Sequence, residues 1–184
     1  MKIFVLIRVL FLLLILAPAV HSEPSELIAT CVACHGLDGR ATSAEWPNLA
    51  GQKEGYMVTQ LTGYRDGSRV NALMAASAQN LSDEEIVAVS RYYAAQKPAS
   101  QSVKSVSQAG LNVRARCISC HGVAGKTVNT EWPNLAGQNA VYLRSQLLAF
   151  RSGARTSVLM NVIAKGLSDE DIDNVSLYYS QIAP

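Results

Sequence analysis

The 184-residue sequence contains only three histidines and four cysteines, and acidic and basic residues together make up only 16% of it. No run of basic residues could follow a nucleic-acid backbone, and the formal net charge is only +2, so nucleic-acid binding is not expected. No segment alternates apolar and polar residues with the two-residue period of a β-strand. These absences predict an all-α fold with few side chains that can carry chemistry.

An apolar stretch opens the chain, but it is too short to cross a membrane. Its uncharged part ends at Val20 and is well below the roughly 20 residues that span a bilayer. Lys2 and Arg8 lie near its start, and the small residues Val20 and Ser22 lie at its end, which is the pattern of a cleavable secretory signal. We therefore predict that residues 1–22 are a signal peptide and that the mature protein is exported, with at most peripheral membrane association.

The remaining sequence is one unit present twice. Residues 31–36, Cys-Val-Ala-Cys-His-Gly, return as Cys-Ile-Ser-Cys-His-Gly at 117–122, an offset of 86 positions. The segment Glu-Trp-Pro-Asn-Leu-Ala-Gly-Gln at 45–52 returns unchanged at the same offset. Two copies indicate a tandem duplication rather than a solenoid, which needs more repeats.

The duplication predicts two tandem domains of one fold. Their expected bounds are 23–96 and 108–184, and the polar segment 97–107 between them is expected to be a linker. Each unit has fewer than about 85 residues, and a helical domain of that size buries little apolar area by itself. We therefore expect each domain to need a staple or a large prosthetic group in its core.

Three helices are expected in the first unit: one capped by Ser25 and leading to Cys31, one over residues 52–65, and one beginning at Ser82. The Ser-Asp-Glu-Glu sequence from Ser82 is a capping box, and Ser168 begins the matching helix of the second unit. The residues expected on the inner face of that last helix are Ile172, Val175, Tyr178 and Tyr179.

The Cys-x-x-Cys-His spacing is typical of covalent attachment of c-type haem. Both thiols add to the vinyl groups of the porphyrin, and the adjacent histidine becomes an axial ligand of the iron. Two residues between the cysteines, on a helical turn, let both sulfurs reach one edge of the ring. The two predicted attachment motifs are Cys31, Cys34 and His35, and Cys117, Cys120 and His121.

Three other interpretations of the cysteines explain fewer features of the two motifs. Export would favour disulfides, but neither a structural bridge nor a thioredoxin-like pair explains a histidine after both motifs, and the βαβ context of a thioredoxin is missing. A zinc site built from all four cysteines would join pairs 86 residues apart, whereas such pairs usually lie about 15 to 20 apart. We therefore predict two covalently bound haem c groups.

Methionine is the expected second axial ligand, because no histidine is left for it. His21 falls in the predicted signal, and His35 and His121 are already used. Met74 and Met160 each lie 39 positions after the motif histidine of their unit, and a thioether is a common haem ligand in electron-transfer proteins. We predict that both methionines lie in loops and ligate the iron.

Other repeated residues have roles that the sequence leaves open. Met57 faces Leu143 in the repeat and is expected to be ordinary core packing. Trp46 and Trp132 either cover a haem edge and bind a propionate, or only pack the loop that contains them. Further candidates for contacts to a propionate or to the other domain are Tyr56, Tyr142, Arg65 and Arg151, although exposed arginines are usually only solvated.

These motifs resemble those of class I cytochrome c domains, and their tandem arrangement is similar to the dihaem cytochrome c4 family of bacterial periplasmic electron carriers. The resemblance covers the whole mature chain and implies two domains related by a pseudo-twofold axis, with haems close enough to exchange electrons through their propionates. It also implies a periplasmic carrier, not an enzyme, between a quinol-oxidising complex and a terminal oxidase. The dihaem subunit of flavocytochrome c sulfide dehydrogenase looks similar, so an electron-accepting subunit of a dehydrogenase is the alternative. We expect a monomer.

The two halves of the mature sequence differ in charge. Residues 23–100 contain 6 basic and 9 acidic residues, a balance of −3, whereas residues 101–184 contain 8 basic and 5 acidic residues, a balance of +3. Such a bipolar chain could direct each half to a different redox partner, most strongly at low ionic strength.

Overall fold

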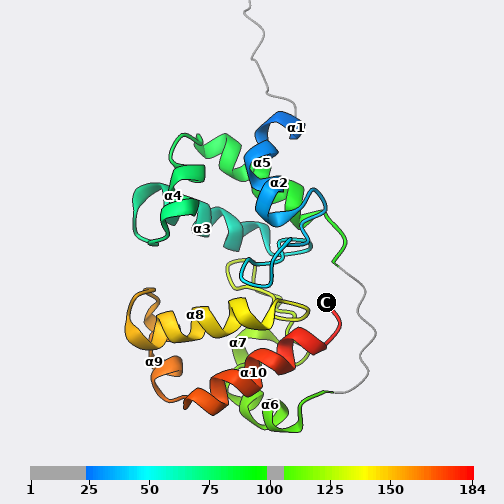
Figure 1. Ribbon diagram of the computed structural model, residues 1–184, viewed down its shortest axis with the longest axis vertical. Helices are drawn as coiled ribbons and strands as arrows, with labels where there is room; N and C mark the ends of the chain where they lie inside the picture. The colour runs from blue at the N-terminus through cyan, green and yellow to red at the C-terminus, as the bar shows by residue number, and fades with distance from the viewer. Residues whose placement is uncertain (1–23, 99–105) are drawn as a thin grey trace, which may run out of the picture.

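The computed structural model describes residues 24–98 and 106–184, which form two helical lobes of matching architecture (Figure 1). All regular structure in these two ranges is helical, as the sequence predicts, and no strand is present in them. Within the same ranges no helix is long and apolar enough to cross a bilayer. The predicted signal peptide lies outside the described residues.

The lobes repeat one another helix by helix. The first contains α1 (Pro24–Leu27), α2 (Ala29–His35), α3 (Glu54–Asp66), α4 (Ala72–Ala78) and α5 (Asp83–Ala94). The second contains α6 (Gln108–Val113), the 3-10 turn η1 (Arg114–Arg116), α7 (Ile118–His121), α8 (Ala140–Ser152), α9 (Val158–Lys165) and α10 (Asp169–Gln181). The helices α8, α9 and α10 start at the sequence offset of 86 positions from α3, α4 and α5, so the duplication in the sequence is also a duplication of structure.

The last helix of each lobe begins with the predicted capping box. Ser82 Oγ accepts from the Glu85 N–H at 3.2 Å, and the Glu85 carboxylate accepts from the Ser82 N–H at 2.9 Å. Ser168 and Asp171 form the same reciprocal pair at 3.0 and 3.1 Å. Each box pairs donors that the first turn of a helix leaves without an intrahelical partner, which fixes where α5 and α10 begin.

Two expected helix starts are wrong by a few residues. The single helix expected after Ser25 is divided in two, because α1 already begins at Pro24 and α2 follows Ile28, which makes no side-chain cap. The helix expected from Gln52 begins at Glu54 instead, because Lys53 has the extended backbone of an N-cap residue. The Gln52 side chain is used outside the helix, in contacts to the other lobe.

Each lobe has a small core in which its last helix packs against the helix before the methionine segment. In the first lobe the core cluster consists of Ile28, Met57, Val89 and Tyr93, and in the second of Leu143, Val175, Tyr178 and Tyr179. Met57 is 6% exposed, which confirms its expected role in packing. The inner face predicted for α10 is confirmed as well, because all four of its residues are buried.

We expect that Ser82→Ala and Ser168→Ala each lower the free energy of unfolding by about 1 kcal/mol, because each leaves a helix-terminal N–H without its partner. Thermal unfolding followed by circular dichroism would measure the loss. Ser145→Ala is the matched control, since this exposed serine lies within α8 and bonds only groups of its own helix, the Tyr142 carbonyl and the Gln146 side chain. Equal effects of all three substitutions would contradict the assignment of the capping boxes.

Candidate haem-binding sites

The first Cys-x-x-Cys-His motif lies at the end of α2. Cys31 and Cys34 are three residues apart in this helix, which puts both thiols on one face, and His35 is its last residue. The second motif spans the junction of η1 and α7 and ends with His121. The histidines are buried, with exposed fractions of 6% and 7%, and the cysteines are half-buried. Each motif therefore presents two accessible thiols next to a buried imidazole.

The cysteines form neither a disulfide nor a metal cluster. All four are free thiols, and the described residues bring no three histidine, cysteine or carboxylate side chains together as a metal site would. Burial raises the pKa of the Cys31 and Cys117 thiols, whereas reactive redox thiols have a lowered pKa. The structure therefore gives no support to the disulfide and zinc interpretations.

Each motif histidine is held through Nδ1 by a backbone carbonyl. His35 Nδ1 lies 3.0 Å from the Pro47 oxygen, and His121 Nδ1 lies 2.9 Å from the Pro133 oxygen. Because a carbonyl oxygen can only accept, Nδ1 carries the proton and Nε2 keeps its lone pair. Burial lowers the pKa of both imidazoles, so they are neutral at pH 7. Both histidines are therefore in the tautomer that ligates a metal through Nε2.

The residue after each histidine needs a conformation that favours glycine. Gly36 has a φ of 72° and Gly122 a φ of 80°. A Cβ at Gly36 would also collide with the carbonyl oxygen of Arg40, and one at Gly122 with that of Lys126. This turn directs the chain out of the helix immediately after the ligand, into the loop whose proline carbonyl binds the imidazole.

Met74 and Met160 each occupy the third position of a short helix, α4 and α9. Their backbone N–H groups donate to the N-cap side chains, Asn71 Oδ1 at 3.0 Å and Ser157 Oγ at 3.3 Å. The expectation that they lie in loops is wrong, because these caps start a helix two residues earlier. In the first lobe α4 packs against α3 and lies at its left end in Figure 1, away from α2. The ligand role of the methionines stays a prediction.

The two lobes meet at a contact that we call the seam, formed by residues 43–60 and 129–146 together with Arg69 and Arg155. The Asn48 N–H donates to Gln138 Oε1 at 2.8 Å, and Gln138 Nε2 donates back to the Asn48 carbonyl at 2.9 Å. Their repeat counterparts, Asn134 and Gln52, form the same two bonds at 2.7 and 3.0 Å. The seam is therefore isologous, since each lobe contributes the same surface, and this is the two-fold relation that the resemblance implies.

The seam and the support of each histidine are parts of one loop. Asn48 directly follows Pro47, the residue whose carbonyl holds His35, and the order is the same in the second lobe. The carbonyl of Trp46 also accepts from Asn139 Nδ2 across the seam, at 2.7 Å. Backbone groups of this loop therefore fix the imidazole on one side and the neighbouring lobe on the other, while the role of the indole stays a prediction.

Arg65 and Arg151 each bond within their own lobe and do not reach the seam. Arg65 donates to the Leu81 carbonyl at 2.8 Å and to Asp83 Oδ1 at 2.5 Å, and Arg151 makes the equivalent bonds in the second lobe. Each arginine ties the end of one helix to the start of the last helix of its lobe. The expected contact to the other domain and the merely solvated side chain are therefore wrong, whereas a contact to a propionate stays a prediction.

Comparison with known proteins agrees with the geometry of the two motifs. The cytochrome c family pattern matches residues 25–95 and 108–182. The chain is 35% identical to a cytochrome c4 of Pseudomonas aeruginosa over 171 residues, which cover 82% of each chain. It is 37% identical over 169 residues to a "thiosulfate dehydrogenase electron acceptor" of Stutzerimonas stutzeri, covering 83% of this chain and 78% of that protein. The structure of a cytochrome c4 from Acidithiobacillus ferrooxidans superposes with a TM-score of 0.77 at 34% identity, covering 84% of this chain and 99% of the other.

The chain belongs to the dihaem cytochrome c4 family. It therefore consists of two tandem cytochrome c domains, and these domains bind two covalent haem c groups.

Both motifs have the side-chain chemistry that covalent attachment of haem c requires. The thiols are free and one helical turn apart, and each histidine keeps the lone pair of Nε2. The surface next to each methionine exposes large apolar side chains, which suits contact with a porphyrin face. Its large exposed apolar side chains are Val70 and Leu73 in the first lobe, and Val158, Leu159 and Val162 in the second.

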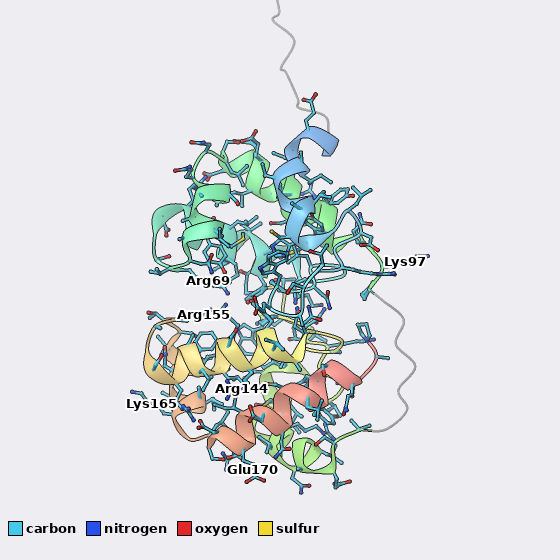
Figure 2. The ribbon with its side chains drawn as sticks, in the orientation of Figure 1. Arg69, Lys97, Arg144, Arg155, Lys165 and Glu170 are labelled. Carbon is cyan, nitrogen blue, oxygen red and sulfur yellow. The ribbon has the colours of Figure 1, made fainter. Side chains whose placement is uncertain are left out.

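The seam tyrosines are among the candidates predicted from the sequence, but the arginines that bind them are not. The Arg155 guanidinium donates to Tyr56 Oη at 2.9 Å, and that of Arg69 donates to Tyr142 Oη at 3.2 Å. Figure 2 shows the two arginines facing one another across the seam. The signal that could have found them is their repetition at the same offset of 86 positions, five residues before each methionine.

We expect Gln52→Ala to lower the free energy of unfolding by about 2 kcal/mol, because it leaves the N–H and carbonyl of the half-buried Asn134 without partners. Gln108→Ala is the matched control, since Gln108 is exposed and bonds only its own helix. Chemical denaturation followed by circular dichroism would measure both. A loss no larger than that of the control would show that the seam contributes nothing to stability.

Proposed function

We propose that the protein is a periplasmic electron carrier, not an enzyme, that passes single electrons between redox proteins through two His/Met-ligated haems. The observation that supports this most directly is the pair of Nδ1-to-carbonyl bonds, which prepares both histidines as neutral Nε2 ligands. The proposal includes cleavage of residues 1–22 as a signal, and domains over residues 23–96 and 108–184 joined by a linker over 97–107.

In this proposal the chain supplies a closed coordination sphere at each site. When bound, haem c supplies an iron that alternates between the ferric and ferrous states. In the first domain Cys31 and Cys34 hold the porphyrin edge, and His35 and Met74 fill the axial positions. In the second domain the same roles fall to Cys117, Cys120, His121 and Met160. With both axial positions filled by side chains, no position remains for a substrate, which favours a carrier over a haem catalyst.

The charge difference between the halves favours two different docking partners. The balance of −3 in the first half suits a partner with a basic docking surface, and the balance of +3 in the second suits an acidic one. A quinol-oxidising complex and a terminal oxidase are the proposed donor and acceptor, and the carrier is proposed to be a monomer.

The second candidate function is that of an electron-accepting subunit of a dehydrogenase. It is favoured by the relative from Stutzerimonas stutzeri named as the electron acceptor of a thiosulfate dehydrogenase. Purification from the native host separates the two functions. A stoichiometric complex with a larger catalytic subunit that survives high salt would identify a subunit, whereas the free dihaem chain would identify a carrier.

We expect Met160→Ala to retain two c-type haems per chain by the pyridine haemochrome assay but to lose one of the two sulfur-to-iron charge-transfer contributions. The reduction potential of the second site should fall by about 59 mV or more, a tenfold change in its redox equilibrium, because a thioether favours the ferrous state. Spectroelectrochemical titration measures both potentials. Met57→Leu is the matched control, because Leu143 already fills that position in the second lobe. Unchanged potentials in Met160→Ala would contradict the ligand assignment.

We expect the rates of reduction and oxidation by the two partners to fall as ionic strength rises, because screening acts over about 10 Å at 0.1 M salt. Glu84→Gln should slow exchange with one partner only, and Lys165→Gln with the other, since these exposed residues belong to opposite halves. Stopped-flow kinetics over a range of salt concentrations would measure the rates. Salt-independent rates with both partners would rule out steering by the bipolar charge.

A further inference from the structure

A cavity of about 380 Å³ lies where the two lobes meet, beside the segments that follow α5 and α10. Its lining residues do not include Arg69 or Arg155, so it is a different part of the contact between the lobes. Figure 2 shows Lys97, which lines the cavity, at one side of the molecule and the two arginines toward the other. The volume suits a small ligand, because sites for such ligands measure about 300 to 1,000 Å³.

Both copies of the repeat line this cavity with equivalent residues. Three pairs of lining residues related by the offset of 86 positions are Arg40 and Lys126, Gly51 and Gly137, and Pro98 and Pro184. The cavity therefore lies across the two-fold relation of the lobes, and a ligand inside it faces both of them.

Close packing of glycine against proline forms two of the walls. Gly51 and Gly137 have φ values of 66° and 69°. A Cβ at Gly51 would lie 2.6 Å from a ring carbon of Pro98, and one at Gly137 would lie 2.8 Å from a ring carbon of Pro184. The amide side chains of the lining bond groups of the opposite lobe. The charged side chains therefore decide what the cavity can bind.

The charged side chains that line the cavity are all cationic. They are Arg40, Lys97 and Lys126, and the described part of the chain adds no acidic side chain to the lining. Arg40 Nε lies 3.2 Å from Asp38 Oδ2, whereas neither lysine takes part in an ion pair within residues 24–98 and 106–184. The cavity therefore keeps an excess of positive charge, which favours an anion.

The backbone positions of Arg40 and Lys126 are fixed by the glycine that precedes each of them. The Gly39 carbonyl accepts from the Leu49 and Ala50 N–H groups at 2.8 and 3.1 Å, and the second lobe repeats both bonds at the same distances. Each cation therefore follows a residue that is bonded to the loop crossing between the lobes. One copy has arginine and the other lysine, so a positive charge is what the two copies share at this position.

We propose that this cavity binds one small divalent oxyanion of the sulfate or phosphate kind, held between Arg40 of the first lobe and Lys126 of the second. The exposed Lys97 adds to the attraction. A tetrahedral oxyanion has acceptor oxygens in several directions and forms charge-assisted hydrogen bonds, which are stronger than neutral ones. Because it bonds a cation of each lobe, the anion stabilises their arrangement. This inference goes beyond the proposed function, since the polypeptide alone forms the cavity.

The test is isothermal titration calorimetry of the holoprotein with sodium sulfate, against a chloride buffer of equal ionic strength. We expect a single sulfate to bind per chain and inorganic phosphate to compete with it. Arg40→Gln and Lys126→Gln should each weaken binding by about tenfold or more, because each removes a hydrogen bond between charged groups. Arg40→Lys and Lys126→Arg keep the charge and should recover most of the affinity.

Lys165→Gln is the matched control, because it removes one charge from an exposed residue of the second lobe that does not line the cavity. Figure 2 shows Lys165 at the far side of that lobe from Lys97. Its affinity for sulfate should equal that of the unmodified protein. An equal loss in Lys165→Gln and Lys126→Gln would show a response to net charge only and would overturn the site, as would the absence of saturable binding.

Thermal unfolding tests whether the anion stabilises the arrangement of the two lobes. Sulfate stabilises folded proteins in general because it is excluded from their surface, and this effect is the same in the unmodified protein and in Arg40→Gln. A specifically bound anion adds a further rise in Tm that saturates with concentration. We expect the further rise in the unmodified protein and not in Arg40→Gln. Equal rises in both would contradict binding between the lobes.

Discussion

The bond between each histidine Nδ1 and a proline carbonyl is the constraint on which the rest of the structure depends. It fixes the tautomer and orientation of the imidazole, and it also positions the loop that contains the carbonyl. The next residue of that loop, Asn48 or Asn134, is therefore delivered to the seam in a defined register. The same few peptide units contact the histidine and the neighbouring lobe. The position of the histidine and the arrangement of the two lobes therefore depend on one another.

The short helices of each lobe explain why such a constraint is needed. The core clusters are small, and α7 has only 4 residues. Helices of this length are not stable alone, so their positions come from tertiary contacts. Capping boxes, the arginine ties from α3 and α8, and the reciprocal amide bonds of the seam supply these contacts from the polypeptide side. Covalent haem supplies the apolar surface that a domain of this size lacks.

Periodic and repeated features were predictable from the sequence, and side-chain direction was not. The duplication, the capping boxes at Ser82 and Ser168, and the buried position of Met57 follow from local patterns that the structure confirms. The start of α3 does not follow from a local pattern, because the Gln52 side chain bonds to a residue 82 positions away instead of lying in the helix. The family resemblance also indicated the haems, whose axial and attachment residues remain predictions.

The side-chain direction of the repeated arginines was not predictable from the sequence either. Arg65 and Arg69 both repeat in the second half and are four positions apart, about one helical turn. The sequence therefore offers no means of deciding which of them reaches the seam. Arg65 is the last-turn residue of α3 and meets the carboxylate at the start of α5, whereas Arg69 follows the turn after that helix and lies at the seam. The choice depends on where α5 and the second lobe are placed, which is tertiary information.

The reciprocal geometry of the seam also restricts how the two halves can diverge. Asn48 pairs with Gln138, and Asn134 pairs with Gln52, so no seam amide pairs with its own duplicate. A substitution of Gln138 therefore leaves the backbone N–H and carbonyl of Asn48 without partners, in the other copy and at a different position of the repeat. The two copies are therefore interlocking partners rather than independent domains, and a change at the seam in one copy alters the contacts of the other.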